Sequence, residues 1–578
     1  MKKQFFYLLI TLLTCSLSPL QAQDEIITHM GDRYVINVEA LNPDSEMTLM
    51  DVLHMCPELI SNNGTTITSG FGFRINNTSL SLDRETTLQN IKASELKKVQ
   101  VCIYTSSAKG VDGARGVIDI YYKTPDKDVV GKVAVEGSTY GNGKLYADVN
   151  AKFNKGYITG YALTNNQYAK VWPSDGGKFT SRLMSEGAHL LVNLDLSSRD
   201  NLKMKFYQQF IDNKDRYTSP ANTGTDVMPE IDRYWNFVSR YDHILNESGA
   251  MVTFEGGVDY LNSTIAGQRV RDTYPYYYTE FNIPVFKQAM WIMAGWEIDY
   301  NNHWNRNLNR EQLMQNALYL QLDYSRGPWV ITLGDRFKHL NFWNRWSNSA
   351  DNGLFAHNRN ENSYFASVGY KTGGHFVQAH FNRDYYVPAV EDFFDGTDAG
   401  RALYNRSIPT ELVWRAEGRY TYQCNNLVFF GNVLHMWKND LPTPNEQTTA
   451  LRTAVTWNKG AFRLTAGVNY YHRHINASDV SGARYENYYN LKLAPTLLLG
   501  HGFRLSSVLL YNSKRSVVGT RPHLYASVKA NKDFGRHINA YVNFHDIAGM
   551  PTMSLLQIYE ADQIFSNRAL TVGMTYRF

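Results

Sequence analysis

The residue types that usually carry chemistry are sparse in this chain, and their spacing is poor for it. Cys56, Cys102 and Cys424 lack the spacing of zinc ligands, and whether the first two form a disulfide is left open. His472 and His474 could contact a metal complex or be ordinary solvated loop residues. The sequence contains no Gly-x-Ser-x-Gly, no His-Glu-x-x-His and no phosphate-binding loop. We therefore predict no enzyme, no cofactor and no metal site.

The composition of the chain excludes further classes of protein. The 578 residues include 58 Lys and Arg against 54 Asp and Glu, so the positive surplus that nucleic-acid binding needs is missing. After about the first fifteen residues, no run reaches the roughly eighteen consecutive apolar residues that a membrane-spanning helix needs. A charged start, the apolar run Phe5–Leu13 and the small residue Ala22 predict a signal peptide over residues 1–22, with lipoprotein processing at Cys15 as the alternative. The protein is therefore expected to be exported.

From about residue 130 to the end, apolar and polar residues alternate over segments of roughly ten, the period of a β-strand with two different faces. In Leu145–Phe153, every second residue is apolar and the residues between are largely polar. Very short Gly- and Asn-rich connections such as Asn154–Gly156 alternate with longer ones, which are Gln167–Glu186, Asp212–Arg233 and Asn301–Asn316. Short turns on one side and external loops on the other are typical of outer-membrane barrels. We predict a 22-stranded antiparallel transmembrane β-barrel over residues 126–578, with its least certain strand in Tyr274–Ile283.

The C-terminus agrees with this prediction. Met574, Tyr576 and the final Phe578 share one strand face. They resemble the assembly signal that the barrel assembly machinery reads in bacterial outer-membrane proteins, and an ordinary edge strand is the alternative.

Residues 33–125 differ in kind and predict a small α+β domain. Thr48–Asp51 forms a capping box, and an apolar stripe that ends at Cys56 predicts a helix. A second helix is expected over Thr87–Ser94. The apolar runs Phe73–Ile75, Val99–Val101 and Val117–Ile120, with Ile67, suit a small sheet.

These segments resemble, in order, the plug of TonB-dependent outer-membrane transporters of the Bacteroidetes type. The match runs through Gly31–Leu41, Asp51–Leu53, Val99–Val101 and Gly116–Ile120, and barrel segments such as Leu333–Arg336 extend it. Two departures are Glu58, where the family has Gly, and Asn76-Asn77, where it has an Asp-Gly or Asn-Gly turn. The resemblance implies an α+β plug inside the barrel lumen, in the outer membrane of a Gram-negative bacterium. It also implies outer-membrane lipid, the TonB complex, the barrel assembly machinery and a small-molecule or peptide ligand as partners.

The function implied is import of a scarce siderophore, cobalamin, metal chelate or peptide, and the alternative is a passive or surface-binding barrel without TonB coupling. Residues 23–32 form an N-terminal tail that contains the candidate TonB box, Asp24, Glu25, Ile26, Ile27 and Thr28, which could also be a plain flexible tail. Candidate ligand-binding residues are at the plug tip or in external loops: Phe71, Phe73, Arg74, Lys109, Tyr276, Tyr277, Trp343 and Trp346. Polar residues of the inner wall, such as Glu255 and Arg336, are expected without any catalytic role.

Overall fold

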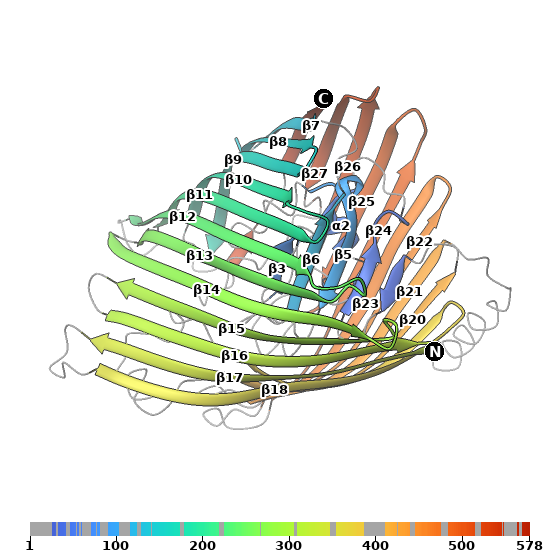
Figure 1. The fold of residues 1–578 in the computed structure, drawn as a ribbon. Helices are drawn as coiled ribbons and strands as arrows, with labels where there is room; N and C mark the ends of the chain where they lie inside the picture. Colours follow the sequence, from blue (N-terminus) through green and yellow to red (C-terminus); the bar gives the residue numbers. More distant parts are fainter. Residues whose placement is uncertain are drawn as a thin grey trace.

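The protein is a closed β-barrel that surrounds a small N-terminal domain (Figure 1). The computed structural model describes residues 26–29, 33–41, 47–53, 55–56, 59, 71–76, 78–80, 91–102, 116–123, 129–139, 141–173, 178–218, 225–265, 267–305, 309–346, 354–386, 411–424, 426–439, 446–475, 484–514, 522–545, 547, 563–565 and 569–578. Within those ranges, none of the helices has the length and apolar character that crossing a membrane requires.

The barrel wall consists of 22 long antiparallel strands, β7 to β27 and β29, and β29 closes it by pairing with β7. The three-residue strand β28 (Gln563–Phe565) pairs with β9. The predicted number of strands and their antiparallel order are confirmed. The bounds are β7 (Val129–Ser138), β8 (Gly143–Phe153), β9 (Gly156–Pro173), β10 (Lys178–Asp195), β11 (Asp200–Thr218), β12 (Thr225–Ile244), β13 (Met251–Ile265), β14 (Gln268–Val285), β15 (Met290–Asn305), β16 (Asn309–Arg326), β17 (Trp329–Trp346), β18 (Leu354–Thr372), β19 (His375–Tyr386), β20 (Glu411–Cys424), β21 (Leu427–Asn439), β22 (Glu446–Lys459), β23 (Phe462–Ile475), β24 (Arg484–Leu498), β25 (Phe503–Asn512), β26 (His523–Phe534), β27 (Ile538–His545) and β29 (Ala569–Arg577).

The two faces of the wall have opposite polarity. On β17, Leu333 and Phe337 are 47% and 43% exposed on the outside, whereas Arg336 and Lys338 are almost fully buried toward the lumen. Because side chains alternate along a strand, the same division repeats around the barrel. An apolar outer belt around a polar interior is the arrangement of a barrel that spans a membrane, where closure leaves no sheet edge in lipid.

The connections differ from the prediction on one side. The short turns are present, and Gly327, Gly373 and Gly460 adopt positive φ angles of 61°, 55° and 58° there. The segments predicted as long external loops, however, are largely strand, because β9 to β12, β15 and β16 continue through them and have 16 to 20 residues each. Roughly ten residues suffice to cross the bilayer. The remaining residues of these strands therefore extend the wall beyond it, which alternation alone does not reveal.

The N-terminal domain contains a six-stranded sheet in the order β1-β2-β5-β6-β3-β4. The strands are β1 (Ile27–His29), β2 (Arg33–Asn37), β3 (Phe71–Ile75), β4 (Thr78–Leu80), β5 (Leu96–Cys102) and β6 (Gly116–Tyr122). The expected runs at Phe73–Ile75, Val99–Val101 and Val117–Ile120 all lie in this sheet, and Ile67 lies outside the described residues. The tail strand β1 pairs with β2, so the sheet begins before residue 33.

The predicted capping box is present at the start of α2 (Leu49–Leu53). The Asp51 carboxylate accepts a 2.8 Å hydrogen bond from the Thr48 backbone N–H, and Thr48 Oγ1 accepts one of 3.3 Å from the Asp51 N–H. The helix stripe that ends at Cys56 is buried in the domain core, and no disulfide joins Cys56 to Cys102.

The helix expected over Thr87–Ser94 is not found in its described part, where Ala93–Glu95 forms a single 3₁₀ turn (η2). The Thr48–Lys92 bridge holds the chain before that turn in an extended conformation. Asn76 adopts a φ of 49°, a left-handed conformation that Asn tolerates better than most residues. Asn77, which stands where the resemblance leads one to expect Gly, lies outside the described residues.

Candidate functional site

The N-terminal domain, called the plug from here on, packs directly on the lumen wall. Val428 and Phe430 of β21 belong to the plug's own hydrophobic cluster, and the Tyr34 ring lies 5.6 Å from that of Phe430. On β9, the Tyr157 hydroxyl accepts a 3.3 Å hydrogen bond from the Asn76 side chain. Apolar and polar contacts on different strands therefore hold the plug inside the barrel.

A buried ion pair lies beneath the apolar contact. The Arg419 guanidinium donates to the Glu417 carboxylate at 2.8 Å, and the Asn432 side chain donates to the same carboxylate at 2.7 Å. The Arg419 guanidinium also lies over the Tyr34 ring, 6.0 Å from its centroid. Because Arg419 and Glu417 are buried, the plug itself helps to keep water away from them.

A second ionic contact joins the plug to the first barrel strand. Lys132 of β7 donates to the carboxylate of Glu95, which lies in the plug, and forms a 3.1 Å ion pair with Asp148 of β8. Only 5% of Lys132 is exposed. Removal of the plug would therefore take away one of the two carboxylates that balance this ammonium group.

Arg74 presents the plug's positive charge to an acidic part of the wall. Burial by itself lowers the pKa of Arg74, but the carboxylates of Asp119, Glu255 and Glu297 outweigh it and leave the pKa above its ordinary value. Asp119 belongs to the plug, whereas Glu255 and Glu297 lie on β13 and β15. The guanidinium therefore remains charged and attracts the plug to this side of the wall. A role of Arg74 in ligand binding stays a prediction.

The described part of the candidate TonB box is ordered against the plug and the wall. Ile27 of β1 pairs with Ile36 of β2 and is 6% exposed, and its backbone N–H donates to Gln423 Oε1 of β20 at 3.1 Å. Ile26 packs against the plug core, and Thr28 is exposed. Asp24 and Glu25 lie outside the described residues.

Phe71 and Phe73 were expected at an exposed plug tip, and the structure corrects this. Both are buried in the plug core, at 9% and 6% exposure, because β3 pairs with β6 and turns the two rings inward. A Cβ added at Gly116 would lie 2.5 Å from the Phe71 ring. The rings therefore stabilise the sheet, and Lys109 of the same predicted tip lies outside the described residues.

The expected loop aromatics lie in strands. Tyr276 and Tyr277 are in the middle of β14, where the least certain strand was predicted, and they face opposite ways. The Tyr276 hydroxyl donates to Glu255 at 3.1 Å inside the lumen, whereas Tyr277 is 36% exposed on the outer face. Trp343 lies near the end of β17, and the side chain of Trp346 lies outside the described residues.

Met574, Tyr576 and Phe578 all lie on the outer face, at 48%, 47% and 50% exposure. The backbone N–H of Phe578 donates to Gly131 of β7 at 3.0 Å, so the last residue takes part in closing the barrel. Their predicted face is confirmed, and recognition by the assembly machinery stays a prediction.

His472 and His474 also point outward, on β23 rather than in a loop. The two imidazoles flank the Tyr485 ring, with centroid distances of 6.0 and 4.5 Å. Among the described residues, no group of three or more His, Cys, Asp and Glu side chains could hold a metal ion. The pair therefore belongs to the aromatic outer surface and does not reach the lumen.

Arg240 is a central lumen residue that the sequence did not single out. Its guanidinium pairs with Asp242 at 2.9 Å and with Glu255 of β13 at 3.4 Å, and the Tyr278 hydroxyl donates to Glu255 at 3.0 Å. The alternation of apolar and polar residues could have placed these side chains on the inner face. Their contacts with one another depend on how three neighbouring strands are aligned, and the sequence of a single strand does not reveal that alignment.

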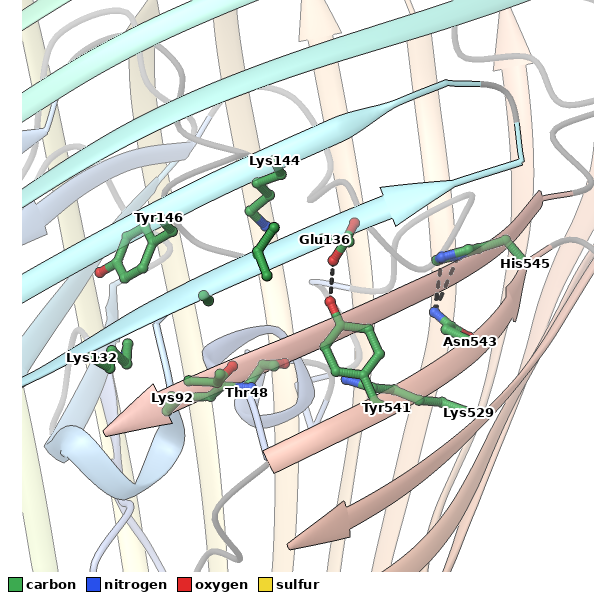
Figure 2. Close-up of a pocket in the computed structure, with 13 residues that line it drawn as sticks. Thr48, Lys92, Lys132, Glu136, Lys144, Tyr146, Lys529, Tyr541, Asn543 and His545 are labelled. Carbon is green, nitrogen blue, oxygen red and sulfur yellow. Dashed lines mark hydrogen bonds between the residues drawn. The ribbon is translucent and has the colours of Figure 1, made fainter. Parts of the chain in front are cut away.

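A cavity of about 160 Å³ lies between the plug and the wall (Figure 2). Thr48 and Lys92 line it from the plug, and the remaining lining residues come from β7, β8, β26, β27 and β29. The Tyr541 hydroxyl donates to Glu136 on one side, and Asn543 contacts His545 at 3.0 Å on another. Side chains of the plug and of the wall therefore converge on this cavity.

Solved structures with the same architecture include receptors and a transporter. The copper transporter OprC superposes with a TM-score of 0.72 at 9% identity, over 97% of this chain and all of that one. The closed form of the ferric-catecholate import receptor Fiu from E. coli K12 gives 0.69 at 12% identity, over 97% and 99%. The alcaligin receptor FauA from Bordetella pertussis gives 0.65 at 10%, over 97% and 96%. The chain shares their fold.

At such identities the likeness concerns architecture alone. No protein-family model matches the sequence, and no curated protein matches it either. The fold nevertheless covers nearly the whole of each chain, so plug and barrel are matched together. The full-length match agrees with the resemblance that the plug segments showed in sequence.

Proposed function

We propose that this protein is a TonB-dependent outer-membrane transporter that imports a scarce ligand through its plugged barrel, and that it is of the Bacteroidetes type. The observation that carries the proposal is the way the plug occupies the lumen. It contacts β7, β9, β20 and β21 through an ion pair, hydrogen bonds and a shared apolar cluster. A barrel of this size cannot be closed by its own side chains, so the plug is the closure.

Coupling would act through the tail. TonB captures an extended segment by strand addition, in which backbone hydrogen bonds provide most of the affinity. The last two residues of the segment Asp24–Thr28, Ile27 and Thr28, belong to β1, which is paired with β2 and contacts Gln423. Because β1 is an edge strand of three residues, a pull on the tail detaches it first and leaves the other five strands paired.

The ligand class rests on the barrel and on the named similarities. Structures with this fold include receptors or transporters for alcaligin, ferric catecholate and copper. We favour a metal chelate over cobalamin or a peptide for that reason. Trp343 of β17 and Tyr276 of β14 remain ligand-contact candidates, the first near the outer end of its strand and the second on the lumen wall.

The test measures uptake of labelled ferric siderophores, cobalamin and copper by cells that carry the protein, with and without TonB. We expect uptake of one probe that requires TonB, and its loss when Asp24–Thr28 is deleted while the barrel remains folded. Lys155→Gln, in the exposed turn between β8 and β9, is the control and should import normally. Uptake that survives the loss of TonB would contradict the proposal and support the passive barrel instead.

A further inference from the structure

Arginines of three alternate strands lie in one row across the outer face of the wall, called the arginine row from here on. Strand pairing aligns Arg233 of β12 with Asn262 of β13, and Asn262 with Arg271 of β14. It continues the row through Trp304 of β15 to Arg310 of β16. These strands are consecutive neighbours in the wall (Figure 1). Because neighbouring strands lie about 4.8 Å apart, the arginines recur about every 10 Å.

The arginine row faces away from the lumen and the plug. Arg233 and Phe237 are separated by an even number of residues on β12, and so are Arg310 and Leu318 on β16, so each pair shares one strand face. Phe237 and Leu318 are 42% and 58% exposed on the outside of the barrel. Arg233, Arg271 and Arg310 are themselves exposed. Their guanidinium groups are therefore accessible from outside the wall.

Neutral groups hold these guanidiniums. The Arg233 guanidinium lies over a phenyl ring of β11, 5.9 Å from its centroid, and that of Arg271 lies 5.4 Å from the Trp304 ring. Arg310 Nε donates a 2.9 Å hydrogen bond to the side-chain oxygen of Asn302. Among the described residues of β12 to β16, the face that the row occupies carries no Asp or Glu. The row is therefore a line of positive charge fixed by uncharged neighbours.

The height of the arginine row follows from the strand lengths. Arg233, Arg271 and Arg310 lie roughly 11, 14 and 16 residues from the ends of their strands at the rim with the short turns. At about 3.3 Å per residue and a tilt near 45°, the row rises from about 26 Å to about 37 Å above that rim. The apolar band of such barrels is about 25 Å tall, and the short turns face the periplasm. The row therefore begins where the apolar band ends, at the level of the outer-leaflet headgroups.

Aromatic residues lie below the arginine row on the same outer face. Trp235 stacks on Tyr260 with ring centroids 5.4 Å apart, and Tyr277 meets Trp296 edge-on at 6.1 Å. Trp and Tyr are enriched at membrane interfaces, where the surroundings are partly apolar and partly polar. Apolar belt, aromatic rings and arginines thus follow one another toward the outside. Acyl chains, interface and phosphates follow the same order in a leaflet of phosphorylated lipid.

We propose that the arginine row is a docking surface for the phosphate groups of phosphorylated lipids in the outer leaflet. A guanidinium group binds phosphate through paired N–H donors, and these charge-assisted hydrogen bonds are stronger than those to neutral groups. The continuity of the row with the lipid-facing belt favours a lipid over an acidic protein as its occupant. Bound headgroups fix the height of the barrel in the membrane on the side of β12 to β16.

The test measures binding of lipid to the fluorescently labelled full chain in detergent micelles by thermophoresis. The probes are lipid A, whose headgroup is phosphorylated, and enzymatically dephosphorylated lipid A. We expect tighter binding of the phosphorylated lipid, with an affinity that falls as salt is added. Arg271→Gln and Arg310→Gln should each weaken binding about fivefold, and the triple variant that also carries Arg233→Gln about a hundredfold.

Arg326→Gln is the matched control, because Arg326 is exposed on the same strand and the same face as Arg310 but lies at the opposite rim. It should bind lipid A like the parent protein, and heat-modifiable mobility in gels verifies that each variant is a folded barrel. Equal affinity of the parent for the two lipids, or unchanged affinity in the folded triple variant, would overturn the proposal. So would equal losses in Arg326→Gln and Arg310→Gln, which would show attraction by total charge alone. The measurement contains no TonB and no transported ligand, so its outcome is independent of the proposed function.

Discussion

The barrel and the plug bury opposite kinds of residues within one chain. In the plug, Val99 and Ile118 of neighbouring strands are fully buried in an apolar core. In the barrel, Leu333 and Phe337 are exposed, and the buried positions of the same strand are taken by Arg336 and Lys338. Both regions consist of β-sheet. The difference follows from the surroundings, since lipid covers the outside of the wall and the plug covers its inside.

This contrast shows why the average hydrophobicity of the chain does not reveal where its apolar residues lie. Apolar residues make up 43% of the chain, an ordinary proportion, yet they are distributed by face rather than by depth. Buried charges in the wall require partners, which they find on neighbouring strands and on the plug. The plug is consequently part of the wall's electrostatic balance as well as its seal.

Removal of the plug tests the contrast most severely. Deletion of residues 33–125 should convert the barrel from a closed to a conducting state, because wall side chains cannot fill a lumen of this width. Single-channel recordings in planar bilayers measure this directly. Conductance no greater than that of the intact chain would show that something other than the plug closes the lumen.

Deletion of the barrel's last residue should have the next largest effect, in this case on assembly. Deletion of Phe578 should strongly reduce the amount of assembled protein in the outer membrane, since it removes the last residue of the predicted assembly signal and its backbone bond to Gly131. Quantification of the heat-modifiable form in outer-membrane fractions measures it. A deletion variant at normal levels would leave the C-terminal strand without a special role in assembly.

Removal of a buried charge that the plug covers should lower the stability of the protein more than removal of an exposed charge. Arg419→Met leaves the Glu417 carboxylate buried without its ion-pair partner, a change that typically costs about 3–5 kcal/mol. Urea unfolding in micelles measures the loss of stability. Arg199→Met, at an exposed turn, is the control and should change stability by less than about 0.5 kcal/mol. Equal effects would mean that the pair is not shielded from water.

Adjacent residues of β8 compare the two faces of the wall. Val149 is 40% exposed on the outside, whereas the Asn150 side chain accepts a 2.6 Å hydrogen bond from Thr159 on the lumen side. Val149→Arg should cost about 2–4 kcal/mol near the middle of the bilayer, and Asn150→Arg much less. Refolding into lipid vesicles at several urea concentrations gives both values. Similar losses for the two variants would contradict the assignment of faces.

The smallest effect concerns the plug's own helix. Thr48→Ala removes the hydroxyl that caps α2 and should destabilise the helix by about 1 kcal/mol. Hydrogen exchange of the amides of Leu49–Leu53 measures the local change, and Thr48→Ser, which keeps the hydroxyl, should exchange like the parent protein. Unaltered exchange in the alanine variant would show that tertiary packing alone holds this helix.

Much of the fold was predictable because its signals are local. The alternation in Leu145–Phe153 reproduces the observed exposure, with Val149 outside and Tyr146 inside, and the Gly-rich turns mark one rim of the barrel. The capping box at Thr48 likewise depends on residues three apart. Patterns of this kind require no knowledge of distant strands.

The candidate site was predicted less well because it depends on register and on strand length. Whether Tyr276 lies in a loop or a strand was ambiguous, since aromatic residues suit both, and its partner Glu255 is fixed only when β13 pairs with β14. Phe73 was expected both in a sheet run, Phe73–Ile75, and among the ligand-binding candidates of the plug tip. The parallel pairing of β3 with β6 instead buries it.

The unequal lengths of the strands give the barrel a sloping mouth. Measured from the rim with the short turns, β17 has 18 residues and β25 has 10. At about 3.3 Å per residue and a tilt near 45°, these reach about 42 Å and about 23 Å. The apolar band of such barrels is about 25 Å tall. One side of the wall therefore ends level with the lipid while the other projects as a rigid lip, so antibodies or proteases outside the cell would reach the β17 side first.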